Sequence, residues 1–265
     1  MSSTKCLVQW CLICLLILSP DLFSATGVVD SEEGVFGCTS GDGGLGIGDD
    51  DADGAEDVQT FSFDFSQSAP GWSAGFADLP QGQDAFFELI FDLRPLLPDL
   101  NPNRNGLFIS GNNRSDDLFM FVRRQVTGLE PNATYLVDFS VSIGSEAGND
   151  CVGAGGPPAI TLKAGATVAQ PVATPNATGL LRMNIDKGNQ TVGGADMQVL
   201  GDIGVNVDCD NPVFATKRLQ SSTARLFQVR TGDDGSLWLV VGTDSGFEGI
   251  TRLFYTRMEA RFSLR

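Results

Sequence analysis

Apolar and polar residues alternate over short stretches along most of the chain after residue 60. In the clearest stretch, 134–143, one set of alternate positions is apolar throughout: Tyr135, Val137, Phe139, Val141 and Ile143. The positions between them are mostly polar. A period of two places one face of a strand on a core and the other towards water. The pattern therefore predicts a half-buried antiparallel strand over 134–143.

The turn before this strand carries Leu129, Pro131 and Tyr135. This spacing resembles the tyrosine corner of fibronectin-type and related β-sandwiches, in which the phenol OH bonds to an upstream backbone group. A plain turn followed by a strand is the alternative interpretation. Both interpretations predict an all-β domain.

Further short apolar runs follow, separated by Gly, Asn, Asp and Pro. They are 61–65, 107–109, 118–126, 160–163, 180–185, 197–200, 214–219, 226–229, 237–241 and 250–264, with 85–93 undecided between strand and short helix. Such spacing is typical of a β-sandwich or jelly roll. A fibronectin-type module has about 100 residues, whereas this pattern extends over 60–265 with no inner linker. We therefore expect one elaborated β-sandwich (jelly roll).

The first part of the chain has a different composition. Lys5 precedes an apolar run at 6–18, and small residues follow at 25–27. This arrangement predicts a signal peptide over 1–27, with a retained N-terminal anchor as the alternative. Residues 28–59 are rich in Gly, Asp, Glu and Ser and predict a disordered acidic linker. Because no other run approaches about twenty apolar residues, we expect no transmembrane span in the mature chain.

The composition excludes several functions. The chain has no histidine, so His-based acid–base catalysis, Ser-His-Asp systems and His-ligated metals are ruled out. Its net charge of −16 argues against nucleic acid as a partner, because phosphate contacts need clustered Lys and Arg. Eleven of the 33 acidic residues precede Val58, so the domain itself is only mildly acidic.

The cysteines predict one disulfide bond. Three of the six lie in the signal segment, which leaves Cys38, Cys151 and Cys209. In an exported chain, Cys151 and Cys209, both within the folded domain, are expected to pair. The chain would then be secreted or lie at the cell surface. Cys38 ends a short segment that loosely resembles a bacterial lipobox, so a lipoprotein is the minor alternative.

The acidic linker contains a candidate calcium site. Its alternating carboxylates resemble the start of EF-hand and thrombospondin type 3 calcium loops: Asp49, Asp51, Asp53 and Asp57. Alternation lets one turn of chain offer several oxygens to a hard cation. An acidic, solvated linker is the alternative interpretation, because Thr60 stands where an EF-hand needs its bidentate Glu.

Polar loops at 110–117, 186–196 and 243–249 carry the candidate binding groups. The expected ligand-binding residues are Asn112, Asn113, Asp116, Asp244, Phe247 and Glu248. Amides and carboxylates can meet sugar hydroxyls, and an aromatic ring can cover an apolar sugar face. Ordinary turn chemistry is the alternative. Trp72 and Trp238 are candidates for a stacking platform, although core packing is favoured for both.

Segments 106–121, 186–202 and 237–249 resemble a family of uncharacterised secreted bacterial proteins, which implies no known activity. The strand frame is loosely similar to jelly-roll carbohydrate-binding modules. The prediction is therefore an exported, non-catalytic binding protein for a glycan, with calcium as an optional cofactor. A structural or adhesive envelope protein is the first alternative. A carboxylate-dependent glycan hydrolase or lyase, with Asp116 and Glu248 as an example of a catalytic pair, is the second.

Overall fold

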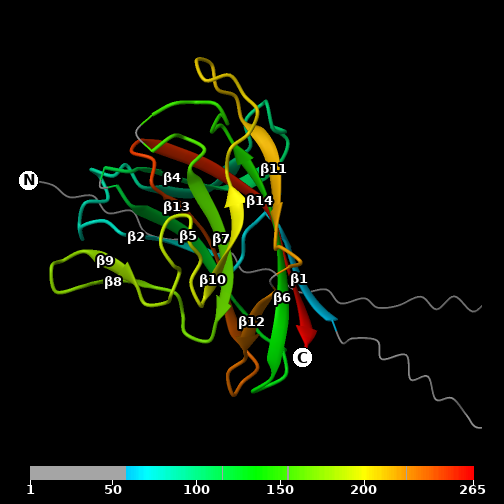
Figure 1. Cartoon of the computed structure of the whole chain (residues 1–265). Coiled ribbons are helices and arrows are strands. Elements are labelled where there is room, and N and C mark those ends of the chain that lie inside the picture. Colours follow the sequence, from blue (N-terminus) through cyan, green and yellow to red (C-terminus); the bar gives the residue numbers. More distant parts are fainter. Residues whose placement is uncertain (1–57, 115, 154, 225) are drawn as a thin grey trace, which may run out of the picture. The chain divides into compact units, whose positions relative to one another are not determined.

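The computed structural model describes residues 58–265 except 115, 154 and 225 (Figure 1). The expected signal peptide, the acidic linker before Val58 and Cys38 lie outside the described residues. So do the four candidate calcium ligands, Asp49, Asp51, Asp53 and Asp57. These predictions therefore remain predictions.

Fourteen strands form in the described part of the chain, and they build two sheets and a hairpin. Sheet A contains β1 (Val58–Asp64), β3 (Ile90–Pro95), β4 (Asn105–Asn112), β6 (Thr134–Ser145), β11 (Ala215–Gln220), β12 (Phe227–Arg230) and β14 (Ile250–Leu264). Sheet B contains β2 (Ser73–Ala77), β5 (Leu118–Val126), β7 (Ile160–Thr167), β10 (Met197–Asp202) and β13 (Leu237–Ser245). The hairpin is β8 (Ala173–Pro175) with β9 (Leu181–Met183).

The two sheets are antiparallel throughout, and the chain repeatedly passes from one to the other. Sheet A has the order β11-β6-β14-β4-β3, with β12 on β6 and β1 on β14, and sheet B has the order β10-β7-β13-β5-β2. Consecutive strands such as β4 and β5, or β13 and β14, belong to different sheets. The prediction of an all-β sandwich is confirmed. No helix in the described ranges is long and apolar enough to cross a membrane.

The main core fills the space between the sheets. Alternate residues of the strands point into this space, and most of them are apolar. In β6 the buried positions are the alternate apolar residues of the sequence pattern, from Tyr135 to Ile143. The Glu130 N–H donates to the Tyr135 phenol oxygen at 2.9 Å, and Leu129 is buried beside it. The predicted tyrosine corner is therefore confirmed, and it fixes the entry into β6.

Smaller clusters lie on the outer faces of the sheets. On sheet B, Phe119, Phe121 and Val240 are covered by apolar residues of the segment 173–185. Trp72 packs edge-on against Phe63 and Phe65 and is 8% exposed, so its expected place in the core is confirmed.

The core position expected for Trp238 is wrong. Strand β13 alternates, so Leu239 and Val241 face the core while Val240 packs in the outer cluster. Trp238 shares the parity of Val240, lies opposite Gln125 and Thr167, and is half-buried on the outer face of sheet B. An apolar run buried on both faces hides this period from the sequence.

Candidate functional site

A disulfide bond joins Cys151 to Cys209, with Cα atoms 5.4 Å apart, so the predicted pairing is confirmed. Cys151 lies in the loop after β6, and Cys209 lies in the loop after β10. The bond holds these two loops together at one end of the sandwich. Gly148 permits the close approach, because a Cβ there would lie 2.3 Å from the Cys151 sulfur.

A cavity of about 520 Å³ opens beside the disulfide, and we call it the Phe247 pocket. This volume is within the range of about 300–1,000 Å³ that small-molecule sites occupy. Its apolar lining is Ala147, Val152, Pro157, Ile160, Ile203, Pro212, Phe247, Ile250 and the disulfide. Its polar lining includes Glu146, Asp150, Asp210, Thr251 and Arg252. The pocket therefore combines an apolar wall with charged groups.

Asn113 fixes the turn that carries Phe247. Its side-chain amide donates to the Ser245 carbonyl at 2.9 Å and to the Phe247 carbonyl at 3.1 Å. Its backbone N–H donates to the Gly249 carbonyl at 2.9 Å. The loop at Gly153 passes the ring so closely that a Cβ there would lie 2.9 Å from a ring carbon. The Phe247 ring is therefore held in place before any ligand arrives.

The polar side of the pocket contains an ion pair between Glu146 and Arg252. The Arg252 side chain is 50% exposed, whereas that of Glu146 is 16% exposed. Arg252 therefore presents N–H donors at the mouth of the pocket, while Asp150 and Asp210 offer carboxylate acceptors.

The two loops expected to share a binding site lie at the same end of the sandwich. Leu118 of β5 is paired with Ser245 of β13, so residues 112–114 and 116–117 lie beside the segment 246–249. Of the six expected ligand residues, Phe247 lines the pocket. Asn112 donates to Glu88 at 2.9 Å, and Asp116 and Glu248 are exposed on their loops. Asn113 is buried and holds the turn.

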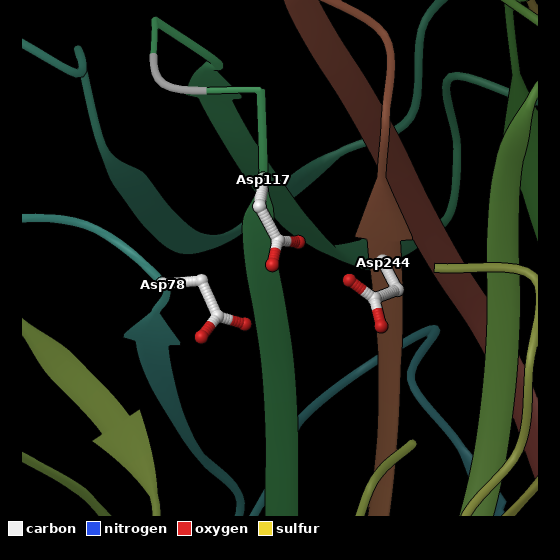
Figure 2. A group of neighbouring side chains, drawn as sticks. All are labelled: Asp78, Asp117 and Asp244. Atoms are coloured by element: carbon white, nitrogen blue, oxygen red, sulfur yellow. The ribbon is translucent and has the colours of Figure 1, made fainter. Parts of the chain in front are cut away.

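Asp244 does not lie on a loop, because β13 continues to Ser245. Its side chain is fully buried within a group of charged residues that we call the buried charge cluster: Asp78, Asp117, Lys163, Lys187 and Asp244. Asp78 follows the last residue of β2, Asp117 precedes the first residue of β5, and Asp244 lies near the end of β13. The three carboxylates converge (Figure 2). The prediction that Asp244 is a loop residue is therefore wrong.

Two lysine ammonium groups lie among these carboxylates. Lys163 Nζ is 2.7 Å from Asp244 Oδ2 and donates to the carbonyls of Lys187 and Val192 at 2.9 Å each. Lys187 Nζ lies 2.8 Å from Asp244 Oδ2 and 3.0 Å from Asp78 Oδ2. Arg182, at the edge of the cluster, is 2.6 Å from Asp78 Oδ1.

Burial and mutual charge shift the proton affinities of this cluster. Burial, with the negative charges of Asp78 and Asp244, raises the pKa of the Asp117 carboxyl to about 7. Burial lowers the pKa of Lys163. Burial acts in the same direction on Lys187, but the charges of Asp244 and Asp78 outweigh it and raise the pKa of Lys187. With Asp117 protonated, two carboxylates face two ammonium groups.

Three convergent carboxylates could in principle hold a hard cation. Here the ammonium group of Lys187 already bridges Asp78 and Asp244, and that of Lys163 binds Asp244. A cation would have to displace a buried lysine. The cluster therefore fits an internal ion-pair network rather than a metal centre.

Sequence reasoning missed the four charged residues of the pocket: Glu146, Asp150, Asp210 and Arg252. The predicted disulfide could have indicated two of them. Asp150 and Asp210 adjoin Cys151 and Cys209, so pairing of the cysteines brings these two carboxylates near each other. Arg252, at the start of β14, becomes a neighbour only through sheet pairing, because Leu253 lies opposite Ser145.

No family model and no curated protein matches the chain, so the resemblance to secreted bacterial proteins stays a prediction. Several solved structures are similar in fold. The family 11 carbohydrate-binding module of the Clostridium thermocellum cellulase Lic26A-Cel5E is 10% identical, with a TM-score of 0.38, over 77% of this chain and 94% of the module. The xylan-binding CBM22-1 domain of Paenibacillus barcinonensis Xyn10C is 14% identical, with a TM-score of 0.34, over 79% of this chain and 96% of that domain.

A third similar structure is the active domain of tailspike protein 4 of bacteriophage CBA120. It is 8% identical, with a TM-score of 0.33, over 74% of this chain. The chain spans 20% of the length of that tailspike domain. Similarities this weak transfer neither a function nor a residue.

Proposed function

We propose that this protein is a non-catalytic carbohydrate-binding protein and that the Phe247 pocket is its binding site. The observation that supports this most is the combination of one fixed aromatic ring with carboxylates and a guanidinium in a single cavity of about 520 Å³. A sugar ring has an apolar face and an edge of hydroxyl groups. The ring of Phe247 suits the face, and Glu146, Asp150, Asp210 and Arg252 suit the edge.

The pocket is built to be rigid. The disulfide fixes one wall, and Asn113 fixes the turn that forms another. A preformed site loses little conformational entropy when a ligand binds. The expected loop residues Asn112, Asp116 and Glu248 lie at the same end of the sandwich and would extend the contact surface for a longer glycan.

Export from the cytoplasm belongs to the same proposal, because structural disulfides persist in oxidising compartments. The bond between Cys151 and Cys209 supports this location. Calcium, if it is a cofactor, would bind the acidic segment that contains Asp49 to Asp57, outside the described residues.

A second candidate function is glycan hydrolysis or lysis. Its support is that three carboxylic acids, Glu146, Asp150 and Asp210, line one cavity, and glycoside cleavage needs two acids at a set separation. Against it, Glu146 is already paired with Arg252. A structural or adhesive role without a small ligand is the remaining alternative.

Binding of the full chain to a panel of oligosaccharides, with and without calcium, tests the proposal. We expect Phe247→Ala and Asp150→Asn each to weaken binding of the selected oligosaccharide at least tenfold. Phe86→Ala is the matched control, because Phe86 is 55% exposed and lies outside the pocket. Equal losses for Phe86→Ala and Phe247→Ala would contradict the assignment of the pocket. Turnover that Asp150→Asn abolishes would favour the hydrolase.

A further inference from the structure

The contact between Lys163 and Asp244 has an unusual combination of properties. The two residues lie on the paired strands β7 and β13, with Gly242 opposite Lys163 and Asp244 opposite Thr161. Both side chains point to the outer face of sheet B, and both are 0% exposed. The amine nitrogen lies 2.7 Å from a carboxylate oxygen. An amine and a carboxyl group are therefore in contact with no access to water.

We propose that Lys163 and Asp244 join in an isopeptide bond that forms inside the folded protein, with Asp117 as the group that moves the proton. The bond would link β7 covalently to β13, at the centre of sheet B. This inference concerns the framework of the sandwich and is independent of the carbohydrate site.

The reaction is a condensation, and its atoms balance without an added reagent. Lys163 passes one proton to Asp244 Oδ2 and becomes a neutral amine. The nitrogen lone pair attacks Cγ of Asp244, and the new Nζ–Cγ bond gives a tetrahedral intermediate. One oxygen of Asp244 leaves as water, whose two protons balance the two that Lys163 loses. Asp117 gives a proton to the oxygen that leaves and takes one back from the nitrogen, so it ends unchanged.

Asp117 is placed for this role. It forms a side-chain hydrogen bond with Asp244, and its pKa is raised to about 7 by burial and by the charges of Asp78 and Asp244. A group with a pKa near the working pH is the most effective general acid and base. Within the described chain, Asp244 Oδ1 is buried and receives no N–H donor, so a protonated Asp117 supplies the hydrogen it can accept. The two carboxyl groups face each other in Figure 2.

Lys163 is the better nucleophile of the two lysines on Asp244. Burial lowers the pKa of Lys163, which favours its neutral and reactive form. Lys187 is also held by Asp78, and its pKa is raised despite its burial, so it stays an ammonium group. The carbonyls of Lys187 and Val192 hold the Lys163 nitrogen beside Asp244.

The site also favours the product. Fixed contact between two groups corresponds to an effective molarity of about 10⁵ to 10⁸ M in well-oriented intramolecular reactions. Two buried charges become one neutral amide, which removes their desolvation cost. Exclusion of water opposes hydrolysis of the bond once it has formed.

The chain contains a matched pair that lacks these conditions. Lys217 Nζ lies 2.8 Å from Asp202 Oδ1, yet the side chains are 29% and 57% exposed. Both pairs join a lysine to an aspartate at 2.7 and 2.8 Å, whereas their burial and their neighbouring groups differ. We expect this pair to remain an ion pair.

Mass spectrometry of the full chain, exported, incubated in its folded state and then reduced and denatured, tests the proposal. We expect wild-type protein to be lighter by one water than the mass calculated for its exported chain, and a branched peptide to join the segments that contain Lys163 and Asp244. Lys163→Met and Asp117→Asn should each abolish the loss, and Lys217→Met should retain it. The wild-type branched peptide stands as evidence even if a variant fails to fold.

Three results would overturn the proposal. One is recovery of linear peptides in which Lys163 and Asp244 are both unmodified, which would leave the pair a buried salt bridge. Another is a water loss that maps to a cyclic imide at Asp234, which precedes Gly235. The third is a branch through Lys187, which would refute the choice of nucleophile. Failure of sugar binding would leave these results unaffected.

Discussion

Two polar regions lie at the same end of the sandwich, and they use their charges in opposite ways. In the buried charge cluster, each carboxylate is within 4 Å of a cationic group, and water is largely excluded. In the Phe247 pocket, carboxylates and a guanidinium line an open cavity. Asp244 and Phe247 are three residues apart in the sequence, yet they belong to different regions because β13 ends at Ser245. Polar residues that are neighbours in the sequence can therefore belong to a buried ion-pair network and to an open pocket.

The largest effect should appear when a carboxylate of the buried charge cluster is removed. Compared with wild-type protein that carries no isopeptide bond, Asp244→Ala leaves Lys163 buried without its partner, and we expect a loss of about 3–5 kcal/mol in the free energy of unfolding, because an uncompensated buried charge is costly. Urea denaturation measures this loss. The control is Asp202→Ala, which removes the exposed partner of Lys217 and should cost less than about 1 kcal/mol. Equal costs would mean that burial does not distinguish the pairs.

The pH dependence of stability sharpens the same comparison. The pKa of Asp117 is raised from 3.8 to about 7 by burial and by Asp78 and Asp244. Between these values the folded protein holds a proton that the unfolded chain releases, so this contribution to stability decreases as pH rises through the window. We expect this contribution to the free energy of unfolding to decrease by about 2 kcal/mol between about pH 5 and about pH 7.

The control for this effect is Asp117→Asn, which cannot titrate. In protein that carries no isopeptide bond, the difference between wild type and Asp117→Asn isolates the Asp117 contribution from that of other carboxyl groups. Formation of the isopeptide bond removes the charge of Asp244 and should reduce the difference. A wild-type curve parallel to that of Asp117→Asn would refute the assigned titration.

The tyrosine corner provides a reference outside both regions. Tyr135→Phe leaves the ring in the core but removes the oxygen that accepts from the Glu130 N–H at 2.9 Å. We expect a loss of about 1–2 kcal/mol, because a backbone donor loses its partner. Thermal unfolding measures it. No change in stability would mean that water replaces the phenol at no cost.

The smallest effect on stability is expected for Glu248, which is exposed on the turn beside Phe247. Glu248→Gln should change the free energy of unfolding by less than about 0.5 kcal/mol, as exposed substitutions usually do. If Glu248 extends the sugar site, the same change should weaken binding of an oligosaccharide, which calorimetry can measure. A large loss of stability would place Glu248 with Asp244 among the structural carboxylates.

The local part of the structure could be predicted from the sequence. The two-residue period of β6, the corner at Tyr135 and the pairing of Cys151 with Cys209 depend on residues near each other or on simple counting. Asp244 and Trp238 were misplaced for a common reason. They lie on the outer face of β13. The burial of that face varies along the strand, because the segment 173–187 covers Val240 and Asp244 but leaves Trp238 half-buried.

The Phe247 pocket could not be predicted for a related reason. Its lining comes from the loops after β6, β10 and β13 and from the starts of β7 and β14. Strand pairing and the disulfide bring those segments together. Lys163 was not recognised either, because a single lysine in an apolar strand shows no period and its partner Asp244 is 81 residues away.

Strand β14 has a consequence for the order of folding. It follows all the other strands in the sequence, yet it lies in the middle of sheet A, between β6 on one side and β1 and β4 on the other (Figure 1). As the chain leaves the ribosome, β1 has no strand to pair with until β14 has emerged, and β6 can pair only with β11 and β12 on its other edge. Contacts between such distant segments also make folding slow. Sheet A is therefore completed only when β14 inserts between strands that precede it in the sequence.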